Sequence, residues 1–305
     1  MSENILIVGC GDIGTALGKA LHSDGYCVTG LKRSTQHPAQ SFKMLYGDVT
    51  KDIELFDLLT QSTFFDQVVV ILTPTERSEK GYKQIYLQGL TNLLSALQQN
   101  AASVKKHTPK VFFISSTSVY SQNAGEWVNE QSATNPTNYR GRILLEAEQL
   151  ITNFGTSNTI NTIVRFSGIY GPNRHHLLKQ VDEKKAITEK ANPHAYTNRI
   201  HRNDCVGVLR FLINSHSQQA SLAPLYLASD DNPAKKYDVV SWLAKQLMHS
   251  HYPESTILNE HTDLNMNKRC DNRLIIEAGY QLQFPSYQAG YISEIERYLR
   301  NKSKA

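Results

Sequence analysis

The sequence predicts an α/β fold, a doubly wound parallel sheet with a smaller C-terminal lobe. Segments with strand character alternate with helical patterns along most of the chain, as in sheets whose parallel strands are joined by helices. The first such segment, Ile5–Val8, leads directly into a glycine-rich turn and then a helical pattern. At 305 residues the chain is long enough for about two domains.

Seven segments are apolar and rich in β-branched or aromatic residues, as buried strands are. They are Ile5–Val8, Cys27–Leu31, Lys43–Tyr46, Gln67–Leu72, Lys110–Ser115, Thr159–Arg165 and Leu225–Ala228. Helical spacing of apolar residues predicts helices over Lys80–Ala102, Tyr139–Asn153, Tyr237–His249, Arg273–Ala278 and Gln288–Arg300.

The composition becomes polar and loop-rich after Gly171 and Pro172. We therefore expect a nucleotide-binding sheet domain over residues 1–172, completed by a return of the chain at about 198–229. Residues 173–305 should then form mainly a substrate-binding lobe.

Three glycines after the first strand, Gly9, Gly11 and Gly14, match the dinucleotide-binding fingerprint of the Rossmann fold. In that motif the first glycine allows a tight turn, the second lets a pyrophosphate approach the backbone, and the third lets the helix pack on the strand. Asp12 and Ile13 begin the helix whose N–H groups would face the phosphates. The alternative is a purely structural turn, but the junction of strand and helix favours cofactor binding.

The end of the second strand indicates which dinucleotide is preferred. Folds that bind NAD(H) usually carry an acidic residue there for the ribose hydroxyls. This chain has Lys32 and Arg33, followed by Ser34 and Thr35. Two cations suit a 2′-phosphate, so we expect NADP(H) to be favoured, with NAD(H) still possible as a cofactor. The alternative is that both cations only solvate a strand end.

Charge and cysteine content exclude several classes of protein. The net charge of +4 comes without a basic, aromatic-rich stretch of the kind that binds nucleic acid. The longest apolar runs, such as Val68–Leu72, are too short to span a membrane. The four cysteines lie far apart without metal-ligand spacing, which indicates reduced thiols and no metal site. We expect a cytoplasmic protein that binds small molecules, without nucleic-acid or membrane partners.

The order of motifs resembles the extended short-chain dehydrogenase/reductase superfamily, of the NAD-dependent epimerase/dehydratase type, along nearly the whole chain. The segments that carry this resemblance are Gly9–Gly14, Gly47–Thr50, Phe112–Ser121, Arg165–Pro172, Asn198–Val206 and Pro224–Asp231. Within the superfamily, the chain is most similar to an atypical YeeZ-like branch. That similarity lies in Thr137–Glu148, Gly171–His176 and Asn267–Gly290.

The resemblance implies an oxidoreductase or an epimerase/dehydratase that acts on a hydroxyl or carbonyl substrate such as a nucleotide sugar. It implies that Ser116, with Thr117 beside it, would hold the reacting oxygen and that Tyr139 would exchange its proton. Asp48 would contact the adenine amino group of the cofactor. Leu72 and Thr73 would complete the cofactor site at the end of the fourth strand.

The resemblance also implies a possible homodimer, because the helices over Lys80–Ala102 and Tyr139–Asn153 match those that pair as a four-helix bundle in related enzymes.

One position departs from the superfamily pattern. A lysine is expected four residues after Tyr139, and this chain has Ile143 there. Arg142 or Arg140 could supply positive charge, although a guanidinium is a poor proton relay. A non-catalytic NADP-binding or sensor protein therefore stays open as an alternative. Tyr139 would then be an aromatic residue packed at a helix start.

Further polar residues occur in the C-terminal half. Arg174–His176 could meet an anionic group or be solvated, and His201 and Asp204 match a superfamily motif whose role is structural. Lys268–Arg269 and Arg273 could bind a substrate phosphate, although a charged helix start explains them equally well.

Overall fold

The computed structural model describes residues 2–33, 40–155, 159–185, 195–247 and 267–303. Its main sheet has seven strands in the order β3-β2-β1-β4-β5-β7-β11. These strands are β1 (Asn4–Val8), β2 (Cys27–Lys32), β3 (Lys43–Tyr46), β4 (Gln67–Val70), β5 (Lys110–Ser116), β7 (Thr162–Phe166) and β11 (Leu225–Ala228). The prediction of a doubly wound α/β sheet is confirmed.

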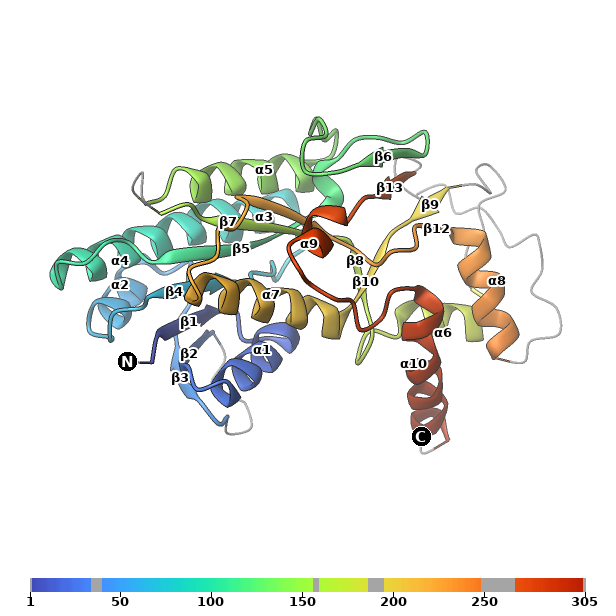
Figure 1. The fold of residues 1–305 in the computed structure, drawn as a ribbon, viewed down its shortest axis with the longest axis horizontal. Coiled ribbons are helices and arrows are strands. Elements are labelled where there is room, and N and C mark those ends of the chain that lie inside the picture. Colours follow the sequence, from blue (N-terminus) through green and yellow to red (C-terminus); the bar gives the residue numbers. More distant parts are fainter. Residues whose placement is uncertain (1, 34–39, 156–158, 186–194, 248–266, 304–305) are drawn as a thin grey trace. The chain divides into compact units, whose positions relative to one another are not determined.

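Helices cover both faces of this sheet (Figure 1). On one face lie α1 (Asp12–Ser23) and α7 (Arg202–Ser217). On the other lie α3 (Glu79–Lys83), α4 (Leu90–Ser103) and α5 (Tyr139–Thr152), and α2 (Asp52–Thr60) packs against α4. No helix in the described part of the chain is long and apolar enough to cross a membrane.

The sheet core follows from strands that are apolar on both faces. Ile5, Leu6 and Ile7 of β1 are completely buried, as are Phe112 and Phe113 of β5. A parallel sheet covered by helices on both sides requires continuous apolar strands of this kind. Strand β1 pairs in parallel with both β2 and β4, so the chain runs outward from β1 in two directions. The reversal of strand order beside β1 is where such sheets bind ligands, outside the carboxyl ends of the strands.

For two of the predicted elements, the difference from the structure has an identifiable reason. The strand predicted from Thr159 begins at Thr162, because the Asn161 side chain takes the place of backbone pairing. Its Oδ1 accepts from the Val111 amide at 2.9 Å, and its Nδ2 donates to the Ile151 carbonyl at 2.9 Å. The long helix predicted over Lys80–Ala102 contains a π-helical turn, Gln84–Gly89, between α3 and α4.

The chain forms two compact units, of which the first comprises residues 1–119, 135–165 and 206–226. The second comprises residues 120–134, 166–205 and 227–305. Its strands are β6 (Glu126–Val128), β8 (Gly168–Tyr170), β9 (Tyr196–Thr197), β10 (Arg199–His201), β12 (Ala234–Lys235) and β13 (Lys268–Cys270). They form the pairs β8–β10, β9–β12 and β6–β13.

The helices of the second unit, apart from the first residues of α7, are α6 (His176–Asp182), α8 (Lys236–Gln246), α9 (Arg273–Glu277) and α10 (Tyr287–Lys302). The apolar core of this unit is built mainly from α6, α8 and α10, and includes Val181, Val240, Leu243 and Ile295. The end of the helix predicted over Tyr237–His249 lies outside the described residues, which stop at 247 in this segment.

A buried ion pair joins three elements of the first unit. The Glu148 carboxylate of α5 accepts from Arg165 of β7 at 2.9 and 2.6 Å. It also accepts from the Ser115 hydroxyl of β5 at 2.5 Å. All three side chains are at most 6% exposed. A buried charge without its partner is strongly destabilising, so each group depends on the others.

We predict that Glu148→Gln lowers the free energy of unfolding by about 3–5 kcal/mol, because it removes the negative charge that pairs with the buried Arg165 guanidinium. Glu146→Gln, an exposed position on the same helix, is the matched control and should change stability by less than about 0.5 kcal/mol. Chemical denaturation followed by circular dichroism measures both. Equal stability of the two variants would contradict the assigned role of the ion pair.

Candidate functional site

The glycine loop lies at the carboxyl end of β1, where its three glycines meet different surroundings. Gly9 has a φ of +95°, and a Cβ there would lie 2.0 Å from the Ile71 carbonyl oxygen. A Cβ on Gly14 would lie 2.4 Å from the Gly9 carbonyl oxygen. A Cβ on Gly11 would meet nothing within 4 Å among the described residues. Folding therefore requires Gly9 and Gly14, while Gly11 leaves open space beside the backbone.

The N-terminus of α1 opens onto this space. Gly11 is its N-cap residue and, having no side chain, makes no side-chain cap hydrogen bond to that end of the helix. The first N–H groups of a helix lack partners within it and carry partial positive charge, which suits a phosphate. Asp12 and Ile13 form the first turn, and only Ile13 is buried. Burial raises the pKa of the neighbouring Cys10 thiol to about 11, so it stays neutral.

The ends of β2 and β4 lie at the same edge of the sheet. Lys32 is half-buried, and the exposed Arg33 donates from Nη1 to the Thr75 hydroxyl at 2.8 Å. Ser34 and Thr35 lie outside the described residues. Thr73 is exposed, and the Leu72 carbonyl accepts from the Tyr86 hydroxyl at 3.0 Å.

Asp48 follows β3 and is tied to its own turn. Its Oδ1 accepts from the amide and the hydroxyl of Thr50, at 2.9 and 2.8 Å. This arrangement fixes the carboxylate beside the start of α2 at the same edge of the sheet.

Ser116 and Tyr139 are placed by one tight contact between β5 and α5. A Cβ on Gly141 would lie 2.5 Å from the Ser118 carbonyl oxygen, so the first turn of α5 rests directly on the segment after β5. Ser116 ends β5, and its Oγ accepts from the Ser118 amide at 3.2 Å. Thr117, next to it, is buried. Both predicted catalytic hydroxyls thus lie within two residues of the same contact.

The Tyr139 hydroxyl has a protein partner. It donates to the Arg77 carbonyl at 2.8 Å, and its ring packs edge-on against Tyr82 with centroids 5.5 Å apart. The Arg140 Nε lies 3.4 Å from the same hydroxyl. Arg142 is exposed and donates to the Thr137 carbonyl at 2.6 Å. Arg140 is therefore the cation beside the phenol.

Ile143 occupies the place of the superfamily lysine and is 1% exposed. It belongs to the buried face of α5 together with Leu144, Ala147 and Ile151. A core residue thus stands where an ammonium would favour the phenolate.

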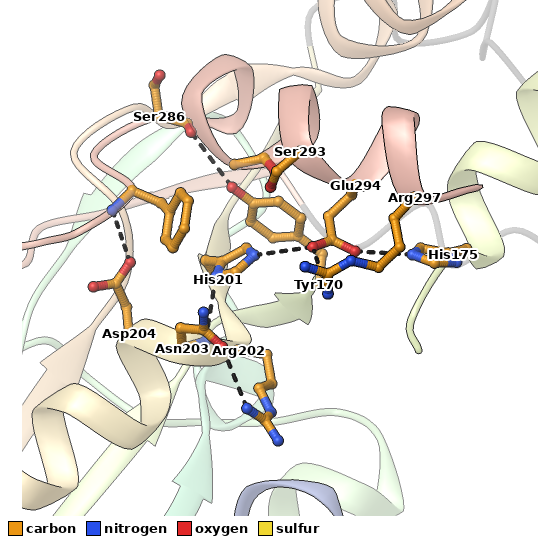
Figure 2. A network of polar contacts seen from close by, with 12 residues as sticks. Tyr170, His175, His201, Arg202, Asn203, Asp204, Ser286, Ser293, Glu294 and Arg297 are labelled. Atoms are coloured by element: carbon orange, nitrogen blue, oxygen red, sulfur yellow. Dashed lines mark hydrogen bonds and ion pairs between the residues drawn. The ribbon is translucent and has the colours of Figure 1, made fainter. Parts of the chain in front are cut away.

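In the second unit, two of the predicted polar residues converge on a buried carboxylate of α10 (Figure 2). Glu294 is 1% exposed and lies 2.9 Å from His175 Nε2. His201 Nε2 lies 3.8 Å from the same carboxylate, too far for a hydrogen bond, and Arg297 approaches to 3.6 Å. Burial lowers the pKa of His201. This network ties α10 to β10 and to the start of α6.

The remaining candidates of this unit have structural partners. Asp204 accepts from the Tyr280 hydroxyl at 2.7 Å and from the amides of Gln283 and Phe284. Lys268 is buried and donates to the Tyr120 carbonyl at 3.0 Å.

The cations next to Lys268 differ in their surroundings. Arg269 lies between the rings of Trp127 and Tyr196, 4.9 and 5.0 Å from their centroids. Arg273 pairs with Asp271 at the start of α9.

Several of these relations were not expected from the sequence. Thr75, Glu294 and Arg77 lie far along the chain from the residues they contact. The spacing of residues within a helix or strand cannot predict such pairs. Arg165 carried a weak signal, because it is the one charged residue of its strand, whereas Glu148 lies on a helix with several other charged residues.

The sheet order and the glycine loop define a Rossmann-type α/β protein. Residues 5–220 match the model of the NAD dependent epimerase/dehydratase family. Protein YeeZ of Escherichia coli K12 is 28% identical over 225 residues, which are 70% of this chain and 74% of YeeZ. The chain therefore belongs to the NAD-dependent epimerase/dehydratase family, as its motifs predicted.

Solved structures agree with this assignment. A candidate NAD-dependent epimerase/dehydratase from Methylobacillus flagellatus is 31% identical, with a TM-score of 0.78 over 98% of this chain and 99% of that one. The UDP-glucose 4-epimerase of Thermus thermophilus, solved as a complex with NAD, has a TM-score of 0.73 at 15% identity. The matched region covers 94% of this chain and 96% of the epimerase chain. At that identity the likeness shows the fold alone.

We predict that Gly14→Ala lowers the free energy of unfolding by about 1–3 kcal/mol, because its Cβ would press on a backbone carbonyl that cannot move aside. Gly11→Ala should change stability by less than about 1 kcal/mol, since open space surrounds that position and its φ is −79°. Urea denaturation of the two variants measures the difference. A similar loss in both would mean that Gly11 is also required by packing.

Proposed function

We propose that this chain is an NADP(H)-dependent oxidoreductase or epimerase/dehydratase that acts on a hydroxyl or carbonyl substrate such as a nucleotide sugar. The observation that carries the proposal is the open space at Gly11, which lies at the start of α1 and between two glycines whose Cβ atoms would press on backbone carbonyls. The family and the NAD-bound epimerase of the same fold support a nicotinamide dinucleotide as the ligand.

The residues around this opening fit the parts of that cofactor. The N–H groups after Gly11 would hold the pyrophosphate, Asp48 would meet the adenine, and Leu72 and Thr73 would line the middle of the cofactor. Lys32 and Arg33 would meet the 2′-phosphate, which is the reason for preferring NADP(H) over NAD(H).

The chemistry would take place at the ends of β5 and α5. When bound, the nicotinamide supplies the acceptor or donor of a hydride. The Ser116 hydroxyl, with Thr117 behind it, would hold the reacting substrate oxygen. Tyr139 would exchange the proton of that oxygen, which requires its hydroxyl to turn from the Arg77 carbonyl toward the substrate. Arg140 or Arg142 would stabilise the phenolate in place of the usual lysine, and the Arg140 Nε already lies 3.4 Å from the Tyr139 hydroxyl.

A second candidate function is a non-catalytic NADP-binding or sensor protein. Two observations favour it: Ile143 is buried where the lysine belongs, and the Tyr139 hydroxyl is bound to a backbone carbonyl. Such a protein would keep the glycine loop and lose the proton relay.

We further propose a cytoplasmic location and a homodimer formed through the long helices of the first unit, α4 and α5. The cysteines support the location, because Cys10, Cys27, Cys205 and Cys270 are all free thiols. We also propose that residues 1–172, with the sheet completed by about 198–229, form the cofactor domain and that residues 173–305 form mainly the substrate-binding lobe.

We predict that the protein binds NADPH more tightly than NADH in a calorimetric titration. Replacing both Lys32 and Arg33 by Ala should cost about 1.5–3 kcal/mol of NADPH binding per lost charged hydrogen bond and leave NADH binding almost unchanged. Gly11→Val should abolish binding of both cofactors, because its side chain would fill the space intended for pyrophosphate. Equal affinities in the parent protein would refute the cofactor preference.

We predict that Ser116→Ala and Tyr139→Phe each reduce turnover by about 10²–10⁴-fold, the usual contribution of a positioned acid/base group. NADPH affinity should stay the same. A screen of carbonyl compounds and nucleotide sugars with NADPH comes first, and thermal melts confirm that the variants fold. If NADPH binds well but no substrate reacts, the result favours the non-catalytic NADP-binding or sensor protein over the enzyme.

A further inference from the structure

Arg33 is held in place by a residue from a distant part of the sequence. Its guanidinium Nη1 donates to the Thr75 hydroxyl at 2.8 Å, and both side chains are exposed. Arg33 directly follows β2, whereas Thr75 lies between β4 and α3. The contact therefore joins two segments at the carboxyl edge of the sheet, on either side of the end of β1.

The segment that carries Thr75 is itself fixed at both ends. The Leu72 carbonyl accepts from Tyr86, and the Arg77 carbonyl accepts from Tyr139. The Ser78 hydroxyl then caps α3 by accepting from the Gly81 amide at 3.1 Å. Thr75 is thus presented from a short, anchored segment, which reduces the entropy lost when Arg33 is ordered against it.

The chemistry of this pair suits an anion with several oxygens. A guanidinium has five N–H donors, and the contact with Thr75 uses one of them. The threonine oxygen accepts from Arg33, so its own proton can be donated to another acceptor. An oxyanion beside Arg33 could therefore receive hydrogen bonds from both side chains.

We propose that Thr75 is a second determinant of cofactor specificity: it orients the Arg33 guanidinium and donates its hydroxyl proton to the same 2′-phosphate. This inference rests on the proposed preference for NADP(H). If the hydrogen bond to Thr75 instead held Arg33 away from the phosphate, removing the hydroxyl would strengthen NADPH binding. The direction of the change in NADPH affinity therefore distinguishes the two roles of Thr75.

The test is a set of calorimetric titrations of the full chain with NADPH and with NADH. Thr75→Val keeps the shape of the side chain and removes the hydroxyl, so NADPH should bind about 3- to 30-fold more weakly and NADH within about twofold of the parent. Thr75→Ser should bind NADPH like the parent. In an Arg33→Ala background, Thr75→Val should have a smaller effect, because the two residues act as a unit.

Thr63→Val, at an exposed position between α2 and β4, is the control for replacing a surface threonine. Thermal melts confirm that every variant folds. Equal binding of NADPH and NADH by the parent would reject the cofactor preference and the inference together. If the parent prefers NADPH while Thr75→Val binds it within twofold, only the inference is overturned. Tighter NADPH binding by Thr75→Val would also overturn it and would show that Thr75 restrains Arg33.

Discussion

The buried carboxylate of Glu148 fixes the geometry on which the candidate site of the first unit depends. It binds the Arg165 guanidinium and the Ser115 hydroxyl inside the core, and so joins α5 to β7 and β5. Because Ser115 precedes Ser116 and α5 begins at Tyr139, this contact acts together with the close approach of Gly141 to Ser118 in positioning the strand end and the helix start. A buried ion pair is costly to form because both charges lose their hydration, and breaking it by removing one partner is strongly destabilising.

The sequence was sufficient to predict the sheet because the physics of that region is local. Strands such as Ile5–Val8 and the glycines after them are specified by consecutive residues, and all seven predicted strands are present. The predicted start of a strand was wrong where a side chain took the hydrogen bond of a backbone group, as Asn161 does by accepting from the Val111 amide. The π-helical turn after Lys83 leaves the apolar periodicity nearly unchanged, so no pattern of residue types reveals it.

The candidate site likewise has features that follow from the local sequence and features that depend on distant contacts. Parallel strands bring their carboxyl ends to one edge, so the positions of Gly11, Arg33 and Ser116 follow from topology once the strands are known. Side-chain partners do not. The hydrogen bonds from Tyr139 to Arg77 and from Arg33 to Thr75 join residues 62 and 42 positions apart. The sequence left Arg142 and Arg140 both open as substitute cations, and in the structure the Arg140 Nε lies 3.4 Å from the Tyr139 hydroxyl.

The unequal surroundings of the three glycines have a consequence for comparing distant relatives. Gly9 and Gly14 are constrained by the backbone they touch, so selection for folding alone would retain them. A Cβ at Gly11 would meet nothing within 4 Å among the described residues, so packing there does not exclude a side chain, whereas a bound ligand would. A relative that keeps the outer two glycines and replaces the middle one would keep the fold of the loop but would lose the space for a ligand. In this chain the middle glycine is retained, and it is the one of the three whose retention carries information about binding.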